Sequence, residues 1–155
     1  MRIAIMQPYF FPYLGYFSGI AASDRWIAFD TPQYIRRGWV NRNRVLSLGK
    51  DEWKYIQVPT AKADRNTPIN QMRLSPNVNW RTDLIRNLDY YKINRAPHYD
   101  DVLQLLDSVW MCDTLDLSKM LIHCLCGICR YLEKGSLCPD AFISEERLEP
   151  AVLVS

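Results

Sequence analysis

The sequence lacks any long hydrophobic run, and no stretch approaches the roughly 20 apolar residues that a helix needs to span a bilayer. The apolar segment near its start is interrupted by Gln7, Pro8 and Pro12, so it also lacks the unbroken core of a signal peptide. We therefore expect no targeting segment and no membrane span. These absences predict a cytoplasmic protein, whose five cysteines are reduced thiols.

An excess of one charge is also missing, because the 155 residues carry a net charge of only +2. Dedicated nucleic-acid binders usually have a larger basic excess, so this balance argues against nucleic acid as the partner. No internal repeat and no low-complexity tract occurs, and the length fits one domain with its own core. We assign that domain to residues 1–134 and interpret residues 135–155, with weak periodicity, as a divergent tail.

Metal ligands in a suitable arrangement are scarce as well. Cys126 and Cys129 form one CxxC pair, but a structural zinc site needs four ligands and no second pair is present. At about 100° per residue, Cys124 falls on the apolar face of a helix, while His123 and Cys126 fall on the opposite side. We predict no metal site, and the residues do not indicate a cofactor.

The pattern that is present is typical of an α/β protein. Residues 2–6 and 25–30 are predicted strands around a helix in 13–24, which favours a parallel pair with a right-handed crossover. Two runs flanking the turn at Gly49 predict a β-hairpin. A short strand is expected in 69–75, followed by helices over 80–96, 98–110 and 116–133, the last with Asp116 as its N-cap. The predicted fold is a mainly parallel Rossmann-like sheet with an inserted β-hairpin and C-terminal helices.

The most unusual feature is a basic segment, because residues 31–50 contain no acidic side chain. Four arginines fall within nine residues of it: Arg36, Arg37, Arg42 and Arg44. On a strand, Asn41 and Asn43 point one way and the neighbouring arginines the other. Arginine forks bind carboxylate or phosphate, and asparagine amides suit hydroxyls and carbonyls. This combination suits a sugar with phosphates, and a solvated basic strand is the alternative.

Two side chains are candidates for proton transfer. Asp30 follows a predicted strand at its carboxyl end, where α/β folds place their ligands. It could be a general base, a metal ligand or an ion-pair partner. His98 precedes a predicted helix and could be an acid or base, or only a cap beside Asp100 and Asp101, which suit the helix dipole.

The uncharged segment "MQPYFFPYLGYF" lies between a predicted strand and a predicted helix. Backbone donors at such a position can face an anion, and the rings can form the wall of a pocket. Its phenylalanines are the better candidates for the core. We assign Gln7, Tyr13 and Tyr16 to the pocket.

Three segments together resemble the WbqC-like family: "IAIMQPYFFPYLGYF", "FDTPQYIRRGWVNRNRVL" and "APHYDDVLQLL". The resemblance runs from about Arg2 to Glu133. Bacterial members are encoded among genes for O-antigen and other surface polysaccharides, and an amino-acid transfer, such as glycine onto a sugar, has been suggested for them. Similar members continue beyond this point, and the tail here departs from theirs. The matching motif positions are Gln7, Pro8, Pro12, Gly15, Tyr16, Asp30, Gln33, Tyr34, Gly38, Trp39, Asn41, Arg42 and Asn43.

The resemblance implies a transferase of surface polysaccharide (O-antigen) biosynthesis that binds a nucleotide-activated sugar or a sugar-linked small molecule. In this hypothesis the arginines bind the phosphate or carboxylate, the aromatic side chains stack on a ring of the ligand, the amides form hydrogen bonds with hydroxyls and Asp30 is the base. The alternatives are a non-catalytic module supporting a glycosyl- or acyltransferase partner, and a nucleic-acid-binding module. The predicted substrate-binding residues are Gln7, Tyr13, Tyr16, Gln33, Tyr34, Arg37, Trp39, Asn41, Arg42, Asn43 and Arg44, and the predicted catalytic residues are Asp30 and His98.

Overall fold

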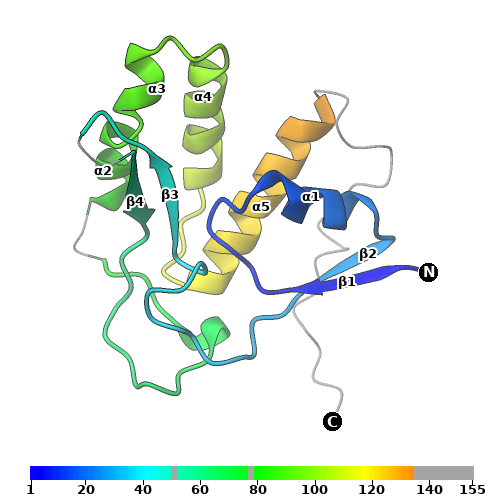
Figure 1. The fold of residues 1–155 in the computed structure, drawn as a ribbon. Coiled ribbons are helices and arrows are strands. Elements are labelled where there is room, and N and C mark those ends of the chain that lie inside the picture. The colour runs from blue at the N-terminus through cyan, green and yellow to red at the C-terminus, as the bar shows by residue number, and fades with distance from the viewer. Residues whose placement is uncertain (50–51, 77–78, 135–155) are drawn as a thin grey trace.

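The chain opens with a strand–helix–strand unit, as the sequence predicts (Figure 1). The computed structural model describes residues 1–49, 52–76 and 79–134. In it, β1 (Ile3–Met6), α1 (Leu14–Ala21) and β2 (Arg25–Ala28) follow one another. The two strands pair in parallel, with Met6 opposite Ala28. Their carboxyl ends therefore lie side by side, and the two loops that leave them, beginning at residues 7 and 29, start at one edge.

The predicted hairpin is also confirmed. It consists of β3 (Arg42–Leu46) and β4 (Trp53–Gln57), which pair antiparallel. Because successive side chains alternate between faces, one face of the hairpin carries the arginines and the rings. We call it the hairpin face, and its residues are Arg42, Arg44, Leu46, Trp53, Tyr55 and Gln57.

The mainly parallel Rossmann-like sheet is not found among the described residues, whose strands form two separate two-stranded sheets. The segment expected as a strand forms the 3₁₀ turn η1 (Ile69–Gln71) and two isolated bridges, Thr60 to Leu74 and Arg73 to Asp116. Pro68 and Pro76 bracket this segment, and proline cannot donate to a sheet ladder. The segment therefore connects the hairpin to the helices without extending either sheet.

Four helices follow within the described part of the chain. The single helix expected over 80–96 is divided into α2 (Trp80–Arg86) and α3 (Asp89–Ile93), because Leu88, at φ −90° and ψ 11°, leaves the helical conformation. Next come α4 (Tyr99–Trp110) and α5 (Leu117–Lys134). Asp116 caps α5 as predicted, its Oδ1 accepting from the Lys119 backbone N–H at 3.1 Å. No helix of the described ranges has the length and apolar character needed to cross a membrane.

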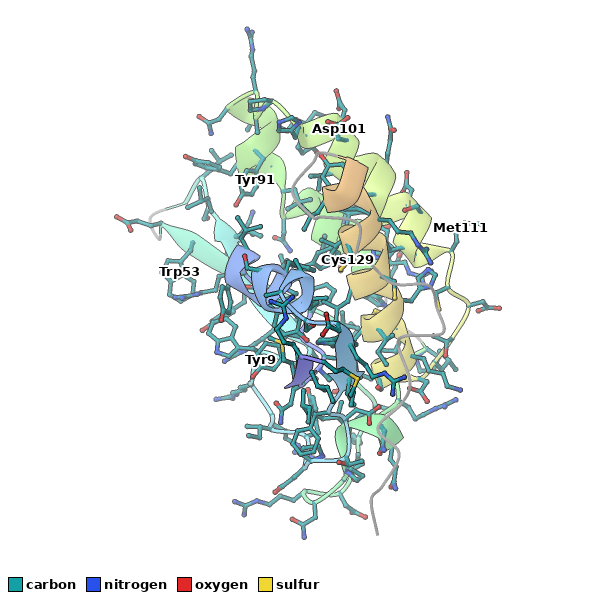
Figure 2. The ribbon with its side chains drawn as sticks, turned by 90° about the vertical axis from the view of Figure 1, so that its right-hand side faces the viewer. Tyr9, Trp53, Tyr91, Asp101, Met111 and Cys129 are labelled. Carbon is teal, nitrogen blue, oxygen red and sulfur yellow. The ribbon has the colours of Figure 1, made fainter. Side chains whose placement is uncertain are left out.

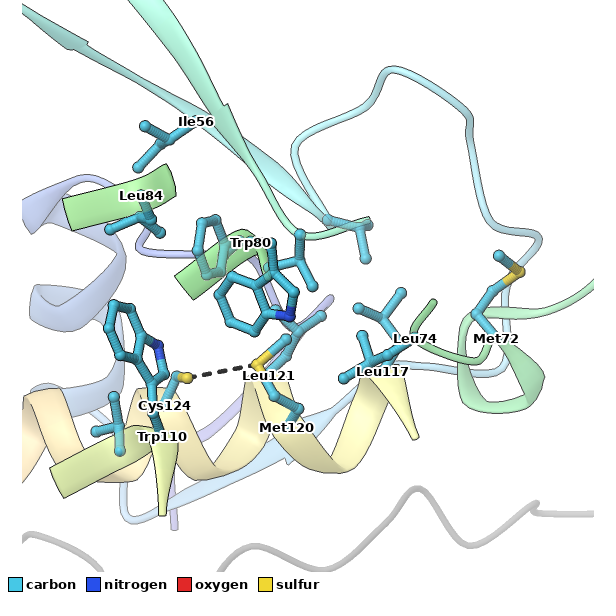
Figure 3. Packing of buried hydrophobic residues seen from close by; sticks show 14 of the residues in the cluster. Ile56, Met72, Leu74, Trp80, Leu84, Trp110, Leu117, Met120, Leu121 and Cys124 are labelled. Atoms are coloured by element: carbon cyan, nitrogen blue, oxygen red, sulfur yellow. Dashed lines mark hydrogen bonds between the residues drawn. The ribbon is translucent and has the colours of Figure 1, made fainter. Parts of the chain in front are cut away.

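Helix α5 takes part in two hydrophobic clusters, and Figure 3 shows its residues in the first of them. Leu117 and Leu121 pack in the cluster that includes the hairpin, α2 and α4, whereas Leu125 and Ile128 pack against α1 and β2. Cys126 belongs to the buried residues and is only 8% exposed. The expectation that Cys126 lies away from the core is wrong. The predicted tail, 135–155, lies outside the described residues.

Candidate functional site

The 7–13 loop is held by a hydrogen bond at Gln7, by the burial of Phe10 and by the amide of Asn43. The Tyr16 hydroxyl donates to the Gln7 carbonyl at 2.8 Å, and Phe10 is fully buried. Asn43 Nδ2 donates to the carbonyls of Phe10, at 3.2 Å, and Phe11. Phe11 has a φ of 47°, a left-handed conformation that a bulky residue rarely adopts. The amide of Asn43 therefore holds a strained loop against β3.

Between this loop and β3 lies a pocket of about 240 Å³, which we call the Tyr13 pocket. Four predicted substrate-binding residues, Tyr13, Trp39, Asn43 and Arg44, meet there although they come from segments far apart in the sequence. Tyr13 and Trp39 are 73% and 42% exposed, so their rings are open to a ligand. The pocket is lined by Tyr9, Phe10, Pro12, Tyr13, Trp39, Asn43 and Arg44.

Guanidinium groups stack on aromatic rings along the hairpin face. Arg42 lies over Tyr55, with its Cζ 4.3 Å from the ring centroid. Arg44 lies between two indoles, 5.4 Å from the Trp39 centroid and 4.8 Å from that of Trp53. Figure 2 shows Trp53 at the periphery of the molecule, where it is 42% exposed. Stacking fixes the two arginines while leaving their N–H edges available for anions.

Arg37 occupies a tight turn rather than a pocket. The Gly38 backbone N–H donates to the Ile35 carbonyl at 3.0 Å, and Arg37, within this turn, has a φ of 63°. A Cβ at position 38 would approach the Ile35 carbonyl oxygen to 2.9 Å, so glycine is required there. The adjacent Arg36 Nη2 donates to the Ala63 carbonyl at 2.8 Å, which ties the turn to the segment after β4.

A second, polar pocket of about 360 Å³ lies between that turn and the segment after β4, and we call it the Lys62 pocket. Tyr34 and Asn41, both predicted for substrate binding, border it and are buried. Burial raises the pKa of the Tyr34 phenol, so it stays protonated. Asn41 Nδ2 donates to the Val58 carbonyl at 2.8 Å. The pocket is lined by Tyr34, Arg36, Asn41, Gln57, Val58, Pro59, Thr60, Ala61, Lys62, Ala63, Asp64 and Met72.

The two predicted catalytic residues lie apart from both pockets. Asp30 is 5% exposed, and its Oδ2 accepts from the Ser118 Oγ at 2.5 Å, which joins the loop after β2 to the first turn of α5. His98 is exposed at the start of α4, and its Nδ1 lies 3.1 Å from Asp101 Oδ2. His98 also borders an apolar groove of about 350 Å³ between the hairpin, α2 and α4. Neither residue lines the Tyr13 or the Lys62 pocket.

The remaining predicted residues make other contacts. Tyr16 is 2% exposed in the second cluster, and burial raises the pKa of its phenol. Gln33 is exposed, and its Nε2 donates to the Arg65 carbonyl at 2.7 Å. Within the described ranges, no group of three or more histidine, cysteine or acidic side chains is arranged to hold a metal ion. The site predicted as one cluster is thus divided between two pockets and the hairpin face.

Sequence reasoning did not select several residues that border these surfaces. Trp53 and Tyr55 alternate in β4 and lie opposite Leu46 and Arg44, so period-2 alternation together with the hairpin register could have found them. Lys62 and Thr60 lie in an irregular segment, and no local pattern places them beside Tyr34.

Comparison with known proteins identifies relatives of this sequence. The profile of the WbqC-like protein family matches residues 7–136. The chain belongs to the WbqC-like protein family. This family is associated with surface polysaccharide biosynthesis. All the residues of both pockets lie within the matched range of this WbqC-like chain.

One relative of the WbqC-like chain is the uncharacterized protein Rv1507c of Mycobacterium tuberculosis. It is 30% identical over 132 residues, which are 84% of this chain and 56% of the relative. The chain therefore spans little more than half the length of that relative. No solved structure matches.

Proposed function

We propose that this WbqC-like protein binds a nucleotide-activated sugar, with one ring and the adjoining phosphates in the Tyr13 pocket, as a substrate of a transferase reaction of surface polysaccharide biosynthesis. The observation that carries the proposal is the meeting of Tyr13, Trp39 and Arg44 around one pocket. Exposed aromatic rings stack on sugar rings and bases, and a guanidinium fork matches the oxygens of a diphosphate. Arg44 is fixed between two indoles, so little side-chain freedom is lost when it binds an anion.

The role of Asn43 in this proposal is to form the pocket wall. Its Nδ2 is used by two loop carbonyls, and its Oδ1 accepts from the Arg44 backbone N–H at 2.7 Å. The described lining of the Tyr13 pocket contains no carboxylate, imidazole or thiol. Its contribution is therefore binding and stabilisation of negative charge rather than proton transfer.

In the form that the resemblance suggests, an aminoacyl or other acyl group is transferred to the sugar. A sugar hydroxyl or amine attacks the carbonyl carbon of an activated acyl donor, and an ester or amide bond forms. The donor's leaving group departs with the bonding electrons, and the proton of the attacking group passes to a base. Asp30 and His98 stay the predicted candidates for this base, and neither lines the Tyr13 pocket.

Calorimetric titration with UDP-glucose, GDP-mannose and dTDP-glucose tests the proposal. We expect binding of at least one probe and a loss of about 10- to 100-fold in affinity for Arg44→Ala, because hydrogen bonds to a charged group contribute about 1.5–3 kcal/mol. Arg44→Lys should recover only part of it. Arg25→Ala removes an exposed arginine of β2, outside the pocket, and is the matched control. Equal binding by Arg44→Ala and the wild type, or no binding to any probe, would refute the proposal.

The exposed hairpin face favours a second candidate, a non-catalytic module that supports a glycosyl- or acyltransferase partner. Leu46, Trp53 and Tyr55 are each 42% exposed, and aromatic residues beside arginine are enriched where proteins meet. This candidate predicts transfer activity only when the partner enzyme is added, and loss of that activity in Trp53→Ser. For the nucleic-acid alternative, binding to oligo(dT) that weakens steeply with salt would be the expected signature.

A further inference from the structure

We infer that the Lys62 pocket is a second binding site, for an acidic monosaccharide: a sugar ring that carries a carboxylate or a phosphate. This inference deepens the proposed function and rests on it for the role of the bound sugar as the second substrate. The binding chemistry itself rests on the residues of the pocket. The segment after β4 forms one wall, and Tyr34, Arg36 and Asn41 form another.

Two cations border the pocket, Arg36 and Lys62, against one carboxylate, Asp64. Neither cation forms a salt bridge with another described residue. The side chain of Arg36 is held in one orientation, because its Nη2 donates to the Ala63 carbonyl at 2.8 Å. Its other N–H groups stay available, since a guanidinium has five. The pocket therefore presents the fixed guanidinium of Arg36 and the ammonium group of Lys62 to one anionic group.

The remaining polar groups suit hydroxyls. Asn41 is 7% exposed, yet its Oδ1 accepts no hydrogen bond from any described residue, because the amide is oriented by donation from Nδ2 to Val58. A buried amide oxygen without a partner destabilises a protein, so a donor that enters beside Asn41 is favoured. Tyr34 is a neutral phenol, and Gln57 and Thr60 add an amide and a hydroxyl. Sugars present hydroxyl donors and acceptors of this kind.

The size and place of the pocket fit a single sugar. Its volume, about 360 Å³, is at the lower end of the range for small-molecule sites. Gln57, on its border, lies opposite Arg42 in the hairpin, whereas the Tyr13 pocket is bordered by Arg44. Two strand residues span about 7 Å, so Gln57 of β4, which borders the Lys62 pocket, and Arg44 of β3, which borders the Tyr13 pocket, lie at neighbouring positions of the hairpin. A nucleotide-activated sugar in one and an acidic sugar in the other would thus be held side by side.

The test follows amide shifts in an NMR titration of the full chain with glucuronic acid, glucose 6-phosphate, glucose and inorganic phosphate. We expect at least one acidic sugar to shift residues 57–64 and to bind about tenfold more tightly than glucose or phosphate. Lys62→Gln and Arg36→Gln should each weaken this binding about tenfold, while Lys119→Gln, an exposed lysine of α5, should not change it. Asn41→Asp keeps the shape of the side chain but removes the donor to the Val58 carbonyl, so its binding of acidic sugars shows how far this hydrogen bond maintains the pocket.

The same variants separate this inference from the proposed function. Lys62→Gln should keep nucleotide-sugar binding, and Arg44→Ala should keep acidic-sugar binding. If the wild type binds an acidic sugar but none of the nucleotide sugars, the proposed function is refuted and the second site stands. The second site is overturned if neither acidic sugar binds, if phosphate binds as tightly as glucose 6-phosphate, or if Lys62→Gln binds acidic sugars like the wild type.

Discussion

Replacing Asn43 by alanine should destabilise the protein far more than its half-buried position on a short strand suggests. The substitution removes the donor to the Phe10 and Phe11 carbonyls and the acceptor for the Arg44 N–H. A buried carbonyl left without a partner costs about 1–3 kcal/mol. Phe11 can then leave its φ of 47°, a conformation that costs about 1–2 kcal/mol, and this release of strain offsets part of the loss. Because the loop relaxes in part, we expect a loss of about 2–4 kcal/mol in the free energy of unfolding.

The isosteric variant Asn43→Asp sharpens this prediction. It keeps the oxygen that accepts from Arg44 but turns a carboxylate oxygen toward two carbonyls, so it should destabilise more than alanine at pH 8. The introduced carboxyl should have a raised pKa in the folded state, because its ionised form is repelled. Relative to the unfolded chain, the folded variant then gains stability as the pH falls toward the ordinary value of about 4 and loses it as the pH rises.

Urea denaturation followed by the fluorescence of the five tryptophans measures both variants. For a chain of this length the predicted loss corresponds to a fall in Tm of about 5–15 °C. Asn66→Ala is the matched control, because this exposed asparagine makes no side-chain hydrogen bond with a described residue. The reasoning is refuted if Asn43→Ala lies within about 0.5 kcal/mol of that control, or if Asn43→Asp is the more stable of the two variants at pH 8.

Three further predictions concern other parts of the fold. An added methyl group at Gly127 would overlap Val109 of α4, so Gly127→Ala should cost about 1–2 kcal/mol, and less in a Val109→Ala background; a double-mutant denaturation cycle measures this. Arg37 has a φ of 63°, which glycine adopts more easily than alanine. The variant Arg37→Gly should therefore be more stable than Arg37→Ala by about 1 kcal/mol in the same assay. Burial raises the pKa of Cys124 from 9.0 to about 12. The contribution of the protonated thiol to the free energy of unfolding is therefore complete below pH 9 and is lost as the pH rises toward 12, because the thiol ionises first in the unfolded chain. Between pH 8 and 10.5 the free energy of unfolding should fall less in Cys124→Ala than in the wild type.

Local patterns predicted those parts of the fold that depend on neighbours in the sequence. Alternation across residues 42–57 gives the hairpin and its two faces, and Asp116 at its N-terminus fixes the start of α5. Whether β2 pairs with β3 depends instead on contacts between distant segments, which no local period records. The Rossmann-like sheet was therefore predicted from a partial pattern, and the described strands form two separate pairs.

The candidate site follows the same division. Tyr16 lies four residues before Ile20, the spacing of one helical face, and both are buried, so helical phase could have assigned Tyr16 to the core. Asn41, just before β3, and Asn43, within it, border different pockets, because only Asn43 meets the 7–13 loop. Residue type and alternation thus predict which side chains are available. Only the packing of the loop decides which of them meet.

The 7–13 loop and β3 determine each other's geometry, and this has a consequence for binding. Phe10 belongs to the first hydrophobic cluster and Tyr16 to the second, so the loop is held between two cores that meet at α5. Asn43 then fixes the loop to the strand that carries Arg44. The Tyr13 pocket is therefore formed by the hydrogen bonds that hold the fold, before any ligand arrives. A ligand that binds there loses little free energy in ordering the protein, which is why uncharged rings and an arginine strand from separate parts of the sequence can act as one surface.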